Sequence, residues 1–539
     1  MATSGFSEGV EVKESSIAGA GRGLFATKDF SPGDVVFSAD RPLVAELNAE
    51  RMLDTCGWCT QRAATDPMER TASAAMGLPT GLIEVKSCVG CKRVAYCSKK
   101  CQSKAWKSEH KYECKAIRPD DRDQLSAHVR AVIKMLGRLQ AEYETEIFTI
   151  SEIMKFLPAR DKGFTEEYKK QDEERYKELY LLGNGAWVFS DKPKIRDFNS
   201  RAISFTVLIT IFFNAFDIGS PLDDMTVGFG FDPTVCSANN SCEPNVTLVH
   251  LQPRIELRAL EPIKAGQEIL MKYTQSTNPF TVRQADLKAR YLFDCKCSKC
   301  KMGTSPDQLL HPQDKLRGIY LKTAEKLVEQ HRSNIAKHLM PGGDEELQTQ
   351  LAGIQAAAYA VLEDHHASAD DLKEMLQLCL GSGKWAWTRQ PVPALCRRLF
   401  EKYMHSGDLY RAFRIGLKLH LEIMPELYPQ PFHHDRIILA WTISYLTNVL
   451  SSPAMSEIYK SFLQSGLEIR LIYYGFLLYA YENTPFMFGY DSPVGRVIKY
   501  TYEQIMASTT ASRADIEASL VNVWPSLETL ARNVDVETM

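Results

Sequence analysis

The chain has 539 residues, of which 45% are hydrophobic and 24% charged, with a formal net charge of −3. This is typical of a soluble globular protein of about three or four domains, and so small a charge says little about partners. The N-terminus has no apolar signal segment, and the most apolar stretch, 203–216, is too short to span a bilayer. We therefore expect a cytoplasmic and nuclear protein, with 203–216 forming a buried strand or helix.

The sequence divides into five regions. Residues 7–47 alternate apolar and turn residues, which predicts short strands, and 201–300 return to that pattern. Residues 48–118 are rich in cysteine, and 119–200 are charged and helix-prone. From about 305 onward apolar residues recur at three- and four-residue spacing, which predicts consecutive helices in a helical-hairpin array. Residues 407–424 are expected to form one amphipathic helix capped by Asp408.

Cysteine clusters dominate two of these regions. Fourteen cysteines in a reducing compartment indicate metal binding rather than disulfides. The first cluster has tight ligand spacing, and its eight sulfur or imidazole ligands predict two structural zinc sites. The alternatives are unrelated residues or a redox CxxC pair. The cluster comprises Cys56, Cys59, Cys88, Cys91, Cys97, Cys101, His110 and Cys114.

A second cluster contributes three thiols, Cys295, Cys297 and Cys300, so a fourth ligand must come from elsewhere. Cys242 and Cys236 are the candidates. Cys242 lies in NNSCEPN, a turn-rich segment that could fold back onto the cluster. The spacing therefore predicts a third structural zinc held by Cys242, Cys295, Cys297 and Cys300.

The first cluster is also basic. Ten Lys or Arg residues against two Glu lie between Lys86 and Arg118. Such a face could attract nucleic acid or acidic partners. We favour the plainer interpretation, a solvated surface that balances thiolate charge.

Four motifs resemble those of SET-domain lysine methyltransferases. GAGRGLFA (19–26) resembles the N-terminal GxG motif, and NNSCEPN (239–245) resembles NHSCxPN. GQEILMKY (266–273) resembles the motif that ends in tyrosine, and RYLFDCKCSKC (290–300) resembles the post-SET segment. NAFDI (214–218) and VGFGFDP (227–233) match the preceding strand pair. The cysteine spacing of the first cluster resembles a MYND zinc finger, so residues 15–300 resemble the SMYD-type methyltransferases.

This resemblance implies an α+β fold: a split SET β-fold with an inserted MYND zinc finger and a helical insert, a cysteine-rich post-SET segment, and an α-helical tetratricopeptide-like C-terminal domain. The finger would hold one ion by Cys56, Cys59, Cys97 and Cys101, and another by Cys88, Cys91, His110 and Cys114. The stretch 63–81, longer than usual for a MYND finger, is expected to be a surface loop. The implied boundaries are 7–47 and 201–280 for the two SET parts, 48–118 for the finger, 119–200 for the insert, 281–303 for post-SET and 304–539 for the helical domain.

The resemblance also implies S-adenosylmethionine as cofactor. Tyr273 would be the catalytic tyrosine and a cofactor contact, while Phe216 and Tyr291 would wall the lysine channel. The remaining cofactor-binding residues would be Gly21, Arg22, Gly23, Asn239, Asn240 and Phe293. Without the resemblance, plain turns and core packing would explain these residue types equally well. Asn240 departs from the family pattern, which has His there; if that residue acts through its backbone amide, Asn serves as well.

We therefore predict a protein-lysine N-methyltransferase acting on histone or non-histone lysines. The alternatives are an inactive MYND/SET scaffold for protein–protein interaction and a nucleic-acid binder that uses the basic finger. The resemblance further implies proline-rich peptide partners for the finger. We expect a monomer with no membrane partner.

Overall fold

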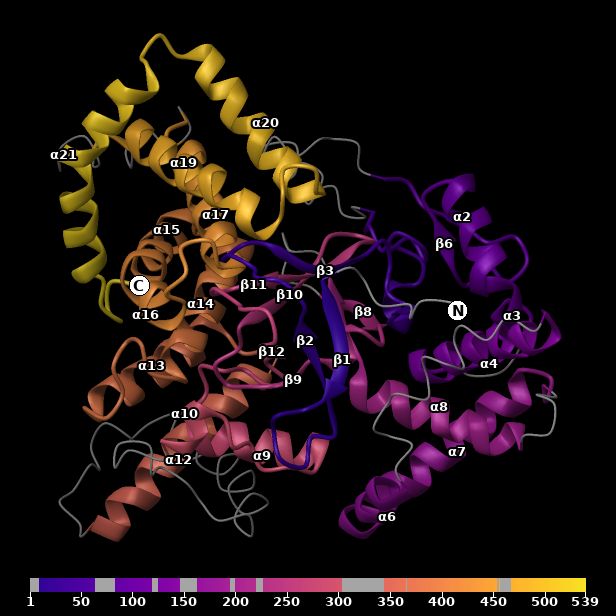
Figure 1. The fold of residues 1–539 in the computed structure, drawn as a ribbon. Coiled ribbons are helices and arrows are strands. Elements are labelled where there is room, and N and C mark those ends of the chain that lie inside the picture. Colours follow the sequence, from indigo (N-terminus) through magenta and orange to yellow (C-terminus); the bar gives the residue numbers. More distant parts are fainter. Residues whose placement is uncertain are drawn as a thin grey trace. The chain divides into compact units, whose positions relative to one another are not determined.

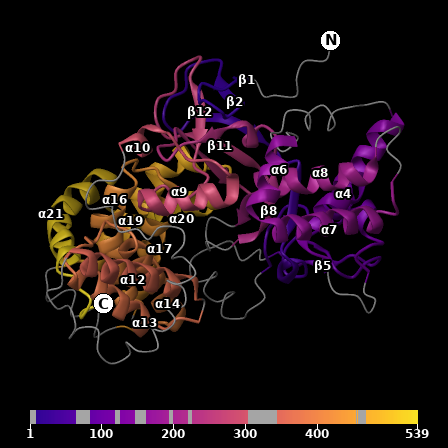
Figure 2. The same ribbon diagram turned by 90° about the horizontal axis from the view of Figure 1, so that it is seen from below.

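The computed structural model describes residues 9–63, 83–118, 125–145, 162–193, 199–219, 226–302, 344–364, 366–452, 455 and 467–539 (Figures 1 and 2). The chain forms two compact units. Unit 1 comprises Met1–Tyr273, Ala289–Phe293 and Phe488–Val497, and unit 2 comprises Thr274–Lys288, Asp294–Met487 and Ile498–Met539. Within the described part of the chain, no helix is both long and apolar enough to cross a membrane.

Short antiparallel strands build most of unit 1, as the alternation in 7–47 and 201–300 predicts. The sheet orders are β1-β2-β12-β9, β10-β11-β3 and β4-β8-β7. Buried Leu24, Ile255, Leu257 and Ile269 form the core of the first two sheets. The strands are β1 (Val10–Glu14), β2 (Arg22–Ala26), β3 (Val35–Ala39), β4 (Val44–Leu47), β7 (Phe216–Gly219), β8 (Thr226–Phe231), β9 (Asn239–Asn240), β10 (Val246–His250), β11 (Ile255–Ala259) and β12 (Glu268–Met271).

Strand β12 decides which motifs meet. It pairs antiparallel with β2, Ile269 opposite Leu24, and parallel with β9, Leu270 opposite Asn239. The Gly-rich turn and the asparagine pair, more than 200 residues apart in sequence, therefore flank one strand.

The cysteine-rich segment folds as a small finger. It contains η1 (Ala49–Arg51), β5 (Lys86–Ser87), β6 (Ala95–Tyr96), α2 (Lys99–Ala105), the π-helix η2 (Trp106–His110) and α3 (Lys111–Glu113). Helix α2 begins at Ser98, whose side chain accepts a hydrogen bond from the Cys101 amide. The apolar core of the finger is continuous with Leu47 of β4 and Ile218 of β7. The expected loop at 63–81 lies, apart from Ala63, outside the described residues.

Four helices form the insert expected in 119–200 and its continuation: α4 (Ala127–Thr145), α6 (Lys162–Gln171), α7 (Glu173–Phe189) and α8 (Ser200–Asn214). Helices α4, α7 and α8 pack on one another (Figure 1). Helix α8 takes up most of the apolar stretch 203–216, so the helical alternative is correct, and Phe216 begins β7. Fully buried Leu208 and Ile211 explain its hydrophobicity.

Unit 2 is helical in its described residues, and consecutive helices such as α12 with α13 and α13 with α14 pack together. Asp408 caps a helix as predicted, accepting from the Arg411 amide. That helix runs past the expected end at 424, through a π-helical turn, to Leu427. The helices are α9 (Phe280–Tyr291), α10 (Ser298–Lys301), α12 (Asp344–Glu363), α13 (Ala369–Gly381), α14 (Val392–Ser406), α15 (Leu409–Lys418), η8 (Leu419–Ile423), α16 (Met424–Leu427), α17 (His434–Leu450), α19 (Ile469–Met487), α20 (Pro493–Ser508) and α21 (Arg513–Arg532). Of these, α9 and α20 extend across the division between the units.

These elements confirm the predicted fold class, α+β with a helical C-terminal region. The exact domain limits stay predictions, and the part of the helical domain at 304–343 lies outside the described residues.

Candidate functional site

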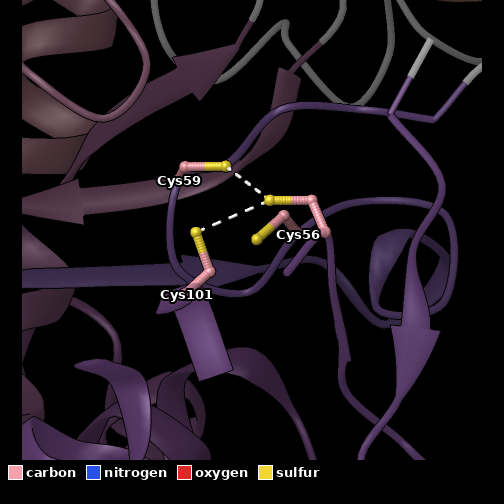
Figure 3. Close-up of side chains that lie close together, drawn as sticks. Cys56, Cys59 and Cys101 are labelled. Atoms are coloured by element: carbon pink, nitrogen blue, oxygen red, sulfur yellow. Dashed lines mark hydrogen bonds between the residues drawn. The ribbon is translucent and has the colours of Figure 1, made fainter. Parts of the chain in front are cut away.

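The finger brings its eight expected ligands into two groups of four. Within each group the sulfur and imidazole nitrogen atoms all lie within 4.8 Å of one another. Figure 3 shows Cys56, Cys59 and Cys101 directing their sulfurs at a common centre. The groups are Cys56, Cys59, Cys97 and Cys101, and Cys88, Cys91, His110 and Cys114. They coincide with the sets that the MYND resemblance implies.

The spacing of these atoms fits zinc. Cys59 Sγ lies 3.7 Å from Cys97 Sγ, which lies 3.5 Å from Cys101 Sγ. Four sulfurs placed at about 2.3 Å around a tetrahedral ion would lie about 3.8 Å apart. Four cysteines, or three cysteines and one histidine, fill all four positions of a tetrahedral ion, which fits a structural zinc and not a catalytic one.

The imidazole of the second group is held by a carboxylate. His110 Nδ1 lies 2.9 Å from Glu113 Oε1, while Nε2 faces Cys91 Sγ at 3.7 Å. Donation of the Nδ1 hydrogen to Glu113 leaves Nε2 as the metal-facing nitrogen, the usual arrangement for a zinc-binding histidine. Both side chains are 1% exposed, so water does not compete for this contact.

Glu113 in turn connects the finger to the sheet. Lys134 of α4 lies 3.2 Å from Glu113 and 2.8 Å from Glu46 of β4, and Arg130 also pairs with Glu46, at 2.9 Å. Burial alone would lower the pKa of Lys134, but the three carboxylates of Glu113, Glu46 and Glu109 raise it above its usual value. A buried charge of this kind is stable only while its partners are present.

The third predicted zinc set is divided between the units. Cys242 is buried in unit 1, and the other three cysteines belong to unit 2, where Cys295 and Cys300 are buried. Within unit 2, Arg283 Nη2 donates to Cys300 Sγ at 3.7 Å. The Gln284 side chain donates to the Cys295 carbonyl and accepts from the Cys295 amide, both at 2.8 Å. A guanidinium donor suits a thiolate. An ion shared with Cys242 stays a prediction.

The Gly-rich turn before β2 has the conformation that glycine permits. Gly21 has φ +72°, and the direction in which a Cβ would point is open. Gly23 is required for a different reason, since a Cβ there would collide with the carboxylate of Glu268 and crowd the Asn239 amide. Arg22 between them has an exposed side chain.

Asn239 links the turn to β12. Its Nδ2 donates to Ser15 Oγ at 3.1 Å, the Arg22 carbonyl at 3.0 Å and Glu268 Oε1 at 2.8 Å. Burial would raise the pKa of Glu268, but hydrogen bonds from Ser16, Asn239 and Ser15 lower it below its usual value. Glu268 is therefore an ionised acceptor that holds the turn, β9 and β12 together.

Asn240 positions Tyr273. Its Oδ1 accepts a hydrogen bond from the Tyr273 backbone N–H at 2.9 Å, and the Tyr273 hydroxyl donates to the Ala238 carbonyl at 2.9 Å. The segment 238–240 thus holds Tyr273 at its backbone and at its phenol. Burial, with smaller contributions from Cys236 and Tyr291, raises the pKa of Tyr273, so its hydroxyl is protonated at neutral pH.

Two further aromatic rings follow the Tyr273 ring in a row. The Tyr291 ring lies 5.0 Å from the Tyr273 ring and 6.4 Å from the Phe293 ring. Burial also raises the pKa of Tyr291. Phe216 packs against the core that contains Ala238, whose carbonyl accepts from the Tyr273 hydroxyl. The nearby thiol of Cys236 donates to the Asn214 carbonyl at 3.1 Å, so it is occupied within unit 1.

This chain is similar to known SET-domain proteins. The SET domain family profile matches residues 21–274. Histone-lysine N-methyltransferase Smyd1 of Mus musculus is 27% identical over 57% of this chain and 59% of its own length. Histone-lysine N-methyltransferase SMYD3 of Mus musculus is 24% identical over 60% of this chain and 69% of its own, and N-lysine methyltransferase SMYD2-B of Danio rerio is 26% identical over 54% and 60%.

Residues 21–274 thus match the SET domain family, and more than half of the chain is similar to SMYD-type lysine methyltransferases. The match spans less than two thirds of Smyd1 and of SMYD2-B, so the activity of those whole proteins does not pass directly to this one. Among solved structures, that of Rubisco LSMT bound to AdoMet covers 95% of both chains at 12% identity with a TM-score of 0.28, a likeness too low to bear on the site.

The SET domain also uses residues to which the sequence assigned no role. Asn245, the last residue of NNSCEPN, donates through Nδ2 to the Glu268 carbonyl at 2.9 Å and accepts from the Leu270 amide at 2.7 Å. Glu268 and Glu113 were likewise missed. Asn245 and Glu268 lie inside motifs that the SET resemblance rests on, which is the signal that could have found them; Glu113, next to the ligand Cys114, has only its position as a signal.

Proposed function

We propose that this chain is an S-adenosylmethionine-dependent protein-lysine N-methyltransferase. The observation that carries the proposal is the position of Tyr273: a protonated phenol fixed by Ala238 and Asn240, beside the ring of Tyr291, within a SET domain. The named relatives are lysine methyltransferases, which supports the same reaction class.

The cofactor fits the polar edge made by the turn and β9. Since Nδ2 of Asn239 is committed to three acceptors, Oδ1 is the atom left for a ligand, and an oxygen accepts from an ammonium group. Exposed Arg22 is placed for a carboxylate, and the open space at Gly21 admits a ligand close to the backbone. When bound, S-adenosylmethionine supplies a methyl group on a sulfonium and leaves as S-adenosylhomocysteine.

The aromatic walls prepare the substrate. A lysine amine must be neutral to attack, and its ordinary pKa is about 10.4. Side chains of Phe216, Tyr273 and Tyr291 offer no carboxylate to stabilise an ammonium, so desolvation between them lowers the lysine pKa. The proton then leaves to solvent before the new N–C bond forms and the S–C bond breaks.

Tyr273 acts as a fixed dipole and not as a base. Its raised pKa keeps the phenol protonated at neutral pH, so it cannot accept the lysine proton. A preorganised hydroxyl near the transferring methyl stabilises the transition state electrostatically, because it needs no reorientation during the reaction.

The proposal includes three structural zinc ions, two in the finger and one at Cys242, Cys295, Cys297 and Cys300. It also includes a protein substrate, histone or non-histone, proline-rich peptide partners for the finger, and a monomer found in cytoplasm and nucleus. The soft donor sets and the SMYD-type relatives support the metal and the substrate class.

Isothermal titration of S-adenosylmethionine into the full chain tests the cofactor. We expect saturable binding that Asn239→Asp weakens at least about tenfold. The new carboxylate would lie next to that of Glu268, and repulsion between the two charges would disturb the turn that is proposed to bind the cofactor. Lys13→Gln, an exposed change on neighbouring β1, is the control and should bind as wild type. Absence of heat with folded wild-type protein would refute the enzyme and favour the scaffold alternative.

A further inference from the structure

A basic groove lies within unit 1. Neither Tyr273 nor any residue that contacts it lines this groove. It has a volume of about 850 Å³ and is lined by the finger, by the turn between β10 and β11 and by the start of α20. The volume is in the range of ligand-binding clefts. We call it the finger groove.

Two of the lining arginines are held in ion pairs and add no net charge. Arg41 pairs with Glu109 at 2.6 Å and stacks on Trp58, with its guanidinium carbon 4.5 Å from the ring centroid. Arg254 pairs with Asp491 at 2.9 Å. These contacts neutralise the groups concerned and give the groove a fixed aromatic and guanidinium surface.

Three further cations line the groove. Lys104 and Lys107, three residues apart on the finger, are exposed and form no ion pair with any described residue. Arg496 of α20 is exposed and donates only to a carbonyl, that of Asp491, at 2.6 Å. Against these three, Asp40 is the lining carboxylate that lacks a cation among the described residues. The groove therefore carries an excess of uncompensated positive charge.

We propose that the finger groove binds an acidic peptide segment of a protein partner. Carboxylates spaced along an extended peptide can meet Lys104 and Lys107 from one element and Arg496 from another, with charge-assisted hydrogen bonds. Asp40 disfavours nucleic acid, because a phosphate backbone has negative charge at every step, whereas a peptide can present a neutral or basic residue there. The proposal does not rest on methyl transfer.

The test is fluorescence anisotropy with the full chain and a labelled (Glu-Gly)₅ peptide, in parallel with a labelled DNA duplex. We expect saturable peptide binding that weakens as salt rises, and that falls at least about tenfold in Lys104→Glu/Lys107→Glu. The matched control is Lys99→Glu/Lys100→Glu, the same charge change at the start of α2 outside the lining, which should lose less than about twofold. Arg496→Glu should weaken binding as the first pair does.

Charge reversal gives a gain-of-function readout. Lys104→Glu/Lys107→Glu should acquire affinity for (Lys-Gly)₅, which a misfolded variant would not do. Equal losses in the two lysine pairs would show a diffuse basic finger and overturn the groove. The proposal would also be overturned if the wild type did not bind the peptide. It would equally be overturned if the wild type bound DNA more tightly than the peptide and the groove variants abolished that DNA binding.

Discussion

At the scale of single residues, the position where this chain departs from the SET motif that it resembles is the most informative. That motif has His where this chain has Asn240, and the sequence left open whether the side chain matters. The structure gives that side chain a partner, the Tyr273 backbone N–H. Its side chain therefore holds Tyr273, the residue that we propose to be catalytic.

Asn240→Leu tests this role. The change leaves the Tyr273 N–H without its acceptor, which costs about 1–3 kcal/mol if the group stays buried, and lets Tyr273 shift. We expect kcat to fall at least about tenfold with cofactor affinity changed less than about twofold. Asn240→His, whose ring nitrogen can accept, should retain more activity than the leucine variant. A large loss of cofactor affinity with unchanged kcat would contradict the assignment.

Glu113→Gln tests the contact behind the second metal group. The amide keeps the shape but weakens the acceptor for His110 and removes one of the charges facing Lys134. Loss of such an outer contact usually costs about 10–100-fold in metal affinity. Zinc transfer to a chromogenic chelator should therefore be faster in this variant, while exposed Glu50→Gln should match wild type. Identical release from all three proteins would remove Glu113 from the metal site.

At the scale of elements, unit 2 contains a histidine that cannot be charged when folded. His420 of η8 packs against the rings of Phe476 and Tyr479 at 5.3 and 4.7 Å. Burial, together with the charge of Arg436, lowers its pKa to about 3. The unfolded chain, with a value near 6.5, therefore binds a proton that the folded chain does not, and stability falls as pH drops below 6.5.

This effect should be visible in urea unfolding. Between pH 7.5 and 5.5 the contribution of His420 amounts to about 1.4 kcal/mol of lost stability. His420→Gln should reduce the pH dependence of unfolding of unit 2 by that amount, whatever its effect at pH 7.5. His366→Gln, at an exposed position, should leave the slope unchanged. An unaltered slope in the His420 variant would show that this ring binds protons equally in the folded and the unfolded chain, contrary to the lowered pKa.

Elements with a strong local pattern were predictable from the sequence. Asp408 marks a helix start because an aspartate there satisfies free amides, and β2 and β3 are short, largely apolar runs next to Gly or Pro-Gly turns. The apolar run 203–216 was ambiguous between strand and helix because continuous hydrophobicity has no period when every face is buried.

At the scale of the whole molecule, the roles of several residues depend on contacts between distant segments, which the sequence alone does not reveal. The role of Glu268 depends on β12 lying between β2 and β9, and the role of Glu113 depends on α4 presenting Lys134 to both the finger and β4. Neither contact has a local signature. The finger groove is a further case, since its cations come from segments nearly 400 residues apart. The metal sets, by contrast, follow short spacings that the MYND resemblance interprets.

The central claim is that unit 1 transfers a methyl group to protein lysine through Tyr273. The decisive measurement is methyl transfer from radiolabelled S-adenosylmethionine to histones and cell-extract proteins, comparing wild type with Tyr273→Phe. Tyr168→Phe, a buried tyrosine in the helical insert core, is the matched control. We predict label on lysine with wild type and the control, and a loss of about 100-fold or more in Tyr273→Phe with cofactor binding retained. Equal labelling by all three proteins would contradict the assignment, and no labelling by wild type that binds cofactor would contradict the activity.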